Sequence, residues 1–244
     1  VVDVGQVYDP LKKRFDHHQP SGAGKRSNDI PFASFGLVWK EFGEVISGGK
    51  DEAKIIDDKL VAPVDAIDNG IKLSIPVFQG IEGYTVGDFF ESFSIDAKTQ
   101  EDFDKIFMKV LFIAQELLRR EVGVAQNSVR DWRKVEDLYN ISENKKIIVL
   151  PEYMHWMRVL IPRQTLYVVT SRQDGKWMVR AVPKEVNSFE VKKPFPASWS
   201  GLNDEFLAGV SGVEDAVVCH RDRHLAVTKT KEGAIKLAEI ALNA

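Results

Sequence analysis

The sequence has little of several features that define whole classes of protein. It has one cysteine, Cys219, among 244 residues, which excludes an internal disulfide and suits a reducing compartment. No apolar run approaches the ~20 residues that span a bilayer, so no membrane partner is expected. The net charge of −3 gives no bulk attraction to nucleic acid, and any polyanion would need a local basic patch or bound metal ions.

Signatures of other catalytic classes are also missing. The sequence has no Gly-x-Ser-x-Gly elbow, no His-Glu-x-x-His helix and no paired Cys-x-x-Cys motif. The glycines of residues 80–87 lack the spacing of a dinucleotide site. The Gly/Ser/Lys-rich residues 19–31 do not form a Walker A motif, and they are equally consistent with a phosphate-contacting loop and with a flexible linker.

What is present is an ordinary globular composition, 44% hydrophobic and 28% charged, in a chain long enough for one large or two modest domains. Apolar periodicity predicts helices over residues 32–42 and 51–69, with Pro63 interrupting the second. A third helix is predicted from the N-cap Thr99 to Gly123, and its apolar stripe from Phe103 to Leu118 is expected to be core.

From residue 146 onwards the pattern changes from helices to strands. A compact apolar run and a hairpin signal at Asp174-Gly175 mark the change, and a final helix is expected after Thr230. The expected strands cover residues 147–150, 165–170, 176–182, 217–220 and 225–227. The sequence therefore predicts an α/β first domain, residues 1–140, and a smaller α+β domain, residues 146–244.

The main concentration of metal-ligand chemistry is the Asp-His-His triplet at residues 16–18, which holds two of the five histidines. Neutral imidazole and carboxylate are ligands that Mn²⁺, Zn²⁺ and Fe²⁺ accept readily. A lone His-His pair is more often a solvated loop. Asp3, on a predicted buried strand over residues 1–4, and the later Asp65/Asp68 cluster favour a metal site instead.

Several motifs in combination resemble a known family. The motifs are Val2-Asp3-Val4-Gly5, Tyr8-Asp9-Pro10, Arg14-Phe15-Asp16-His17-His18-Gln19, Ala33-Ser34-Phe35-Gly36-Leu37-Val38-Trp39-Lys40, Val64-Asp65-Ala66-Ile67-Asp68-Asn69-Gly70, Trp199-Ser200-Gly201-Leu202 and Thr228-Lys229-Thr230-Lys231-Glu232-Gly233-Ala234. Together they resemble the melanocyte proliferating gene family, which is related to the DHH phosphoesterase superfamily. Its members are catalogued as metal-dependent protein hydrolases and described as RNA exonucleases.

The resemblance covers nearly the whole chain and implies a DHH-type parallel-sheet catalytic domain followed by a smaller substrate-binding domain. Family members normally open with a segment resembling His-Asn-Gly-x-Phe-His-x-Asp, which is absent from this sequence. On that comparison the metal-binding domain is expected to be N-terminally incomplete. Residues 1–244 alone are then expected to be inactive and to self-associate.

The resemblance also implies a ligand set. Asp3 corresponds to the bridging acid and His17 to a terminal ligand. Asp68 resembles the remaining acid best, and Asp65, one helical turn away, is the alternative. The other interpretation of both acids is a helix end that caps the following turn. The implied cofactor is a divalent metal, Mn²⁺ before others, in a two-metal site in the intact protein.

Two further groups have implied roles. His18 is placed to donate to a phosphate oxygen, and Asp16 to orient a histidine, which makes this pair the expected catalytic residues. In the second domain His220, Arg221, Arg223 and His224 form a cationic cluster that is expected to bind substrate phosphates. A solvated hairpin turn is the equal alternative there, because the family often has an aromatic residue and glycines where this chain has His224-Leu225.

These residues and the resemblance predict a metal-dependent phosphodiesterase, a 3′–5′ exonuclease acting on RNA or short oligonucleotides. The hydrolytic class is inferred from the ligand set, and the RNA substrate from the resemblance alone. The alternative is a catalytically impaired member that binds nucleotides or protein partners. The expected location is cytoplasmic, or mitochondrial or nuclear in a eukaryote, and a homo-oligomer is left open.

Overall fold

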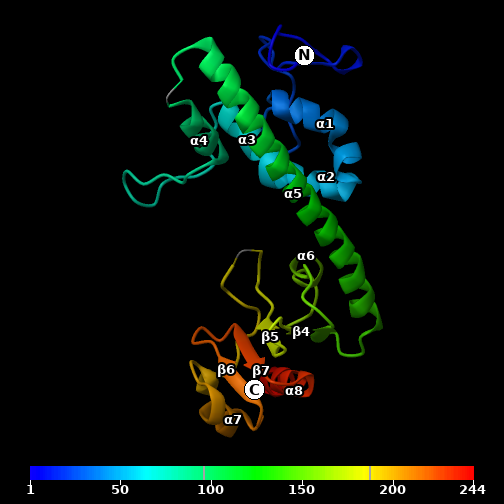
Figure 1. The fold of residues 1–244 in the computed structure, drawn as a ribbon. Coiled ribbons are helices and arrows are strands. Elements are labelled where there is room, and N and C mark those ends of the chain that lie inside the picture. Colours follow the sequence, from blue (N-terminus) through cyan, green and yellow to red (C-terminus); the bar gives the residue numbers. More distant parts are fainter. Residues whose placement is uncertain (96, 187) are drawn as a thin grey trace. The chain divides into compact units, whose positions relative to one another are not determined.

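The computed structural model describes residues 1–95, 97–186 and 188–244, and the chain divides into two compact units, Val1–Gln126 and Asn127–Ala244 (Figure 1). One long helix, α5 (Gln100–Ile141), contributes residues to both units. The division expected near residue 140 falls at the end of this helix, whereas the compact units divide within it. Helices and a sheet with a parallel strand pair confirm the predicted α/β class.

Consecutive helices build the core of the first unit. Both helices predicted here from periodicity are confirmed. The second is divided into two by a π-helical turn, and Pro63 accounts for this irregularity because it lacks the amide proton of a regular helical hydrogen bond. The elements are α1 (Ser34–Ser47), α2 (Lys50–Ile56), the π-helical turn (Asp57–Val61) and α3 (Ala62–Asp68). Their core contains the buried residues Trp39, Ile56, Val61 and Ala125.

The prediction of a buried strand at residues 1–4 is wrong. All three valines of this segment are more than half exposed, and Val2 makes only an isolated parallel bridge to Phe15. Phe15 ends β2 (Arg14–Phe15), which pairs antiparallel with β1 (Tyr8–Asp9). Among the described residues of this unit no further strand covers the segment, so its apolar pattern does not lead to burial.

The helix α5 follows α4 (Val86–Glu91) and a 3-10 turn (Ser92–Ser94), and it begins with the predicted Thr99 cap. Its predicted end at Gly123 is wrong, because a glycine inside a helix costs only about 1 kcal/mol and the helix continues to Ile141. The predicted core stripe is wrong over most of its length: no residue from 100 to 120 is fully buried, and Phe107 is 64% exposed. Only towards its end does the stripe meet the core, where Leu118 packs against it. Periodicity identifies a face that can be buried, but it does not supply the partner.

A five-stranded sheet in the order β3-β4-β5-β7-β6 organises the second unit. β3 and β4 are parallel, and the other neighbours are antiparallel. The predicted strands are confirmed, and so is the helix predicted after Thr230. The elements are β3 (Ile147–Leu150), α6 (Met157–Leu160), β4 (Tyr167–Ser171), β5 (Trp177–Ala181), a 3-10 turn (Ala197–Trp199), α7 (Asp204–Ser211), β6 (Ala216–Cys219), β7 (Leu225–Thr228) and α8 (Lys231–Asn243).

Both faces of this sheet are covered, because successive side chains of a strand point to opposite faces. Tyr167 and Val169 of β4 belong to the core shared with α7 and α8. Val168 belongs to a second core with Trp156 and with Val135 of α5. No helix in the described part of the chain is both long and apolar enough to cross a bilayer.

Candidate metal centre

His17 lies where three elements of the first unit meet. It follows β2, while Ser34 is the first residue of α1 and Asp68 is the last residue of α3. His17 Nε2 lies 3.1 Å from Asp68 Oδ2, and His17 Nδ1 lies 3.1 Å from Ser34 Oγ. The packing of α1 against α3 therefore brings a carboxylate and a hydroxyl to the two nitrogens of one imidazole.

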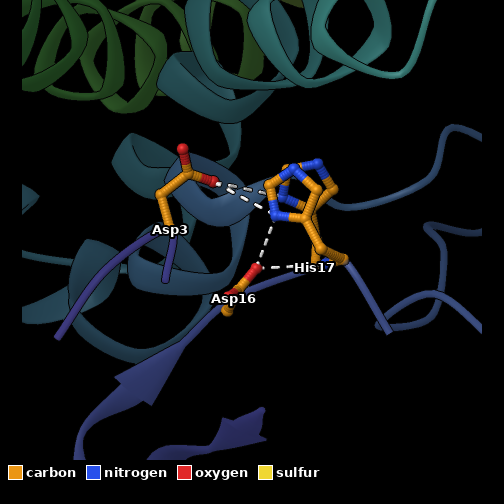
Figure 2. Close-up of side chains that lie close together, drawn as sticks. Asp3, Asp16 and His17 are labelled. Carbon is orange, nitrogen blue, oxygen red and sulfur yellow. Dashed lines mark hydrogen bonds and ion pairs between the residues drawn. The ribbon is translucent and has the colours of Figure 1, made fainter. Parts of the chain in front are cut away.

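Asp3 reaches the same imidazole from the Nδ1 side. Ser34 Oγ donates to Asp3 Oδ1 at 2.9 Å, and this oxygen lies 3.6 Å from His17 Nδ1. Because the Ser34 proton goes to Asp3, Ser34 Oγ can accept from the Nδ1–H of His17. In that tautomer the Nε2 lone pair is available to a metal ion held between His17 and Asp68. Figure 2 shows Asp3 and His17 together with Asp16. Ser34 lies in the 33–40 motif, but nothing else in the sequence indicates that it belongs to this centre.

The residues around His17 fit a divalent metal ion. Two neighbouring ligands of an octahedral ion, each bonded at about 2.1 Å, lie roughly 3 Å apart, and His17 Nε2 and Asp68 Oδ2 are 3.1 Å apart. Asp3, Asp16, His17 and His18 each offer a ligand atom, and these atoms lie within 4.8 Å of one another. The carboxylates of Asp3 and Asp68, however, face opposite nitrogens of one ring.

Asp16 orients His18 rather than His17. Its Oδ1 accepts from His18 Nδ1 at 2.7 Å and from His18 N at 3.0 Å, and its Oδ2 accepts from Gln6 N at 2.6 Å. Burial raises the pKa of Asp16, but these donors outweigh burial and lower the pKa to about 2. The hydrogen bond to Asp16 in turn raises the pKa of His18. The His18 side chain is 55% exposed and can meet a ligand.

Asp65, the alternative to Asp68, is fully buried and has partners away from His17. Its Oδ1 accepts from Gly36 N at 2.9 Å, and its Oδ2 lies 2.8 Å from Arg26 Nη1. Burial raises the pKa of Asp65, and Arg26 opposes this shift without cancelling it. A Cβ at Gly36 would lie 1.7 Å from Asp65 Oδ2, so this contact requires glycine. The fold thus brings Asp68, and not Asp65, to His17.

The loop of residues 19–31 is anchored by its own cations. The guanidinium of Arg26, with a side chain only 8% exposed, pairs with Asp57 at 2.7 Å as well as with Asp65. Lys25 pairs with Asp29. Arg26 is therefore not available to a phosphate, whereas the exposed Lys25–Asp29 pair contributes little and does not withdraw Lys25 from one.

Comparison with known proteins identifies the family. Residues 1–242 match the family MYG1_exonuc, described as Uncharacterised protein family (UPF0160). The chain belongs to the MYG1 family. MYG1 exonuclease of Rattus norvegicus is 28% identical over 282 residues, spanning 99% of this chain and 72% of the rat protein. MYG1 protein C27H6.8 of Caenorhabditis elegans is 28% identical over 284 residues, spanning 99% and 82%. No solved structure matches the chain significantly.

The residues predicted to bind substrate in this MYG1-family chain lie together on the turn between β6 and β7. The ring centroids of His220 and His224 are 4.4 Å apart, and the Arg221 side chain is 83% exposed. Burial, together with His220, lowers the pKa of His224. Arg223 has a different partner, because its Nη1 donates to the carbonyl oxygen of Phe195 at 3.3 Å.

Proposed function

We propose that this chain is a metal-dependent phosphodiesterase that acts as a 3′–5′ exonuclease on RNA or short oligonucleotides. The observation that carries the proposal is the His17–Asp68 pair at ligand spacing, beside Asp3 and the exposed His18. Membership of the MYG1 family supports it, because the rat and human relatives are named MYG1 exonuclease. Mn²⁺ as the cofactor and a cytoplasmic location, which suits the free thiol of Cys219, belong to the same proposal.

Each residue of the centre has a distinct part in the proposed reaction. His17 Nε2 and Asp68 would hold the ion, and Ser34 would orient the ring through its contact with Nδ1. A divalent ion supplies Lewis acidity towards phosphoryl oxygens and water. His18, oriented by Asp16 at Nδ1, donates from Nε2 to an oxygen of the phosphodiester.

The turn between β6 and β7 is the proposed contact for substrate phosphates. His220, Arg221 and His224 offer N–H donors there, and Arg221 is the most exposed cation of the three. Arg223 contributes through the conformation of the turn, because its guanidinium is bonded to the main chain. Contacts of this kind add affinity that does not depend on base sequence.

Digestion of a 5′-labelled short oligoribonucleotide by the full-length protein with Mn²⁺ tests the proposal. His17→Ala should lower kcat/KM on the order of 10³-fold, about 4 kcal/mol of transition-state stabilisation, because a metal ligand is lost. His155→Ala is the matched control, since this histidine pairs with Asp131 in the second unit and lies outside the centre. Parental activity in His17→Ala, or digestion that survives a chelator, would refute the proposal.

One observation favours the second candidate function, a family member that binds nucleotides without turnover. Asp3, the expected bridging acid, faces Nδ1 of His17, whereas Asp68 faces Nε2. A carboxylate that bridges two ions would have to reach the same ion as His17 Nε2 and Asp68. Fluorescence anisotropy of the same labelled oligoribonucleotide separates the two. Saturable binding with no shortened product over a long incubation would establish binding without catalysis.

A further inference from the structure

Ligand-type side chains also meet in the second unit, on the turn that joins β6 to β7. His220, Asp222 and His224 each offer a ligand atom, and these atoms lie within 4.8 Å of one another. The two imidazole rings are 4.4 Å apart between centroids and inclined at 57°. Asp222 completes a His-x-Asp-x-His pattern over five consecutive residues.

The main chain of this turn is fixed by hydrogen bonds. His220 N donates to Leu225 O, and Arg223 N donates to His220 O, each at 2.8 Å. Arg223 has a φ of 57°, the left-handed conformation found in tight turns. Its Nη1 donates to Phe195 O, so the guanidinium is engaged away from the three ligand side chains. A fixed backbone reduces the entropy that ligand binding must remove.

The spacing of the donors fits a small cation. His220 Nδ1 lies 3.6 Å from Asp222 Oδ2. Two ligands bonded to one Zn²⁺ at about 2.1 Å and at a tetrahedral angle lie roughly 3.4 Å apart. His220 Nδ1 also accepts from Asp222 N at 3.2 Å, a bond that a metal at this nitrogen would replace. Two imidazoles and one carboxylate are a donor set that Zn²⁺ accepts, with a water in the fourth position.

Two nearby arginines repel a bound cation, but they do not block the ligand atoms of the turn. Arg221 Nε lies 3.8 Å from Asp222 Oδ1, but the two side chains are 83% and 65% exposed, and a surface pair of this kind contributes little. Arg180 lines a cavity of about 360 Å³ together with His224. The two arginines therefore limit the affinity of the turn for a metal ion, while the ligand atoms stay accessible.

We propose that His220, Asp222 and His224 form a binding site for a divalent transition-metal ion of the Zn²⁺ type. The site belongs to a different unit from the centre at His17 and needs no substrate, so it goes beyond the proposed function. A bound ion would add positive charge to the turn that is proposed to contact substrate phosphates.

Zn²⁺ binding to the full chain by titration calorimetry tests the site, with the visible absorption of Co²⁺ as a check on coordination. The parent protein and His17→Ala should both bind a Zn²⁺ equivalent that His224→Ala loses. Asp222→Asn replaces an exposed side chain and leaves the fold intact. It should weaken the same equivalent by about tenfold or more.

His155→Ala is the matched control, because this imidazole pairs with Asp131 at 2.7 Å in the same unit and should leave Zn²⁺ binding unchanged. If His224→Ala and Asp222→Asn bind as many Zn²⁺ equivalents as the parent protein, with the same affinity, the site does not exist. Failure of the proposed function would instead appear as unchanged oligoribonucleotide digestion by His17→Ala.

Discussion

The two units differ in how far they cover their apolar side chains. In the second unit Tyr167, Val168 and Val169 are all fully buried, because helices pack on both faces of the sheet. In the first unit α5 leaves Phe107 and Phe112 64% and 72% exposed. The candidate metal centre lies in the unit with the smaller apolar core.

The two units therefore depend on different interactions for their stability. The first unit joins its N-terminal loop and helices through polar contacts such as the buried Arg26–Asp65 pair. Removing one partner of a buried pair is far more damaging than removing the pair, since an uncompensated charge is left behind. We therefore expect the first unit to be sensitive to specific polar changes and the second to lost apolar volume.

The largest expected effect is in the second unit. Phe195→Ala should lower the free energy of unfolding by about 3–5 kcal/mol, because the ring is fully buried and stacks 5.9 Å from the Trp199 ring. Phe107→Ala, in the first unit, should change it by less than about 0.5 kcal/mol. Denaturant unfolding with region-resolved hydrogen exchange measures both. Equal losses for the two variants would remove the distinction between the units.

The next largest effect is in the first unit. Gly36→Ala should lower the free energy of unfolding by about 3 kcal/mol, because the added Cβ would lie 1.7 Å from Asp65 Oδ2 and displace this carboxylate from Arg26. Gly123→Ala is the control: no atom lies within 4 Å of its added Cβ, so it should stabilise the helix by about 0.5–1 kcal/mol. Chemical denaturation measures both, and a neutral Gly36→Ala would show that the Arg26–Asp65 contact is not required.

A smaller effect on stability should accompany a specific effect on metal binding. Ser34→Ala should weaken Mn²⁺ binding roughly 10–100-fold, because Nδ1 of His17 loses its partner. Ser47→Ala removes another buried hydroxyl of α1, bonded to Gly43 O, and should cost a similar ~1 kcal/mol of folding free energy while leaving Mn²⁺ affinity unchanged. Calorimetric titration of both variants tests this, and equal affinities would show that Ser34 has only a structural role.

The smallest effect on stability is expected at the exposed face of α5. Phe112→Lys should change the free energy of unfolding by less than about 0.5 kcal/mol. It should also lower any self-association through this face, because large exposed apolar patches favour association. Light scattering over a concentration series measures this, with Lys109→Glu as a change of charge in the same helix. Unchanged scattering by Phe112→Lys would show that this face does not mediate association.

Local signals in the sequence predicted much of the second unit and the start of α5 in the first. The Asp174-Gly175 turn acts within a few residues, and the antiparallel pairing of β4 with β5 follows from it. The Thr99 cap likewise determines where α5 begins. Such signals succeed because both partners of each interaction are close in the sequence.

The first unit shows where sequence reasoning fails. The stripe on α5 and the valines of residues 1–4 are apolar, but burial depends on distant segments that the pattern does not specify. For the centre, the motifs pointed to Asp3, His17 and Asp68, which lie around one imidazole. They favoured Asp68 but left Asp65 open as the alternative, because Asp65 is held away from His17 by Arg26, 39 positions before it in the chain.

The π-helical turn at Asp57–Val61 sets the rotation of α3 about its axis relative to α2. A π-helical turn accommodates one residue more than a regular α-helical turn, and each residue rotates an α-helix by about 100°. Deleting a single residue within this turn would allow a continuous helix, yet the new phase would rotate the Asp65 and Asp68 faces relative to α2. An insertion or deletion of one residue in this turn would therefore separate Asp65 from Arg26 and Asp68 from His17.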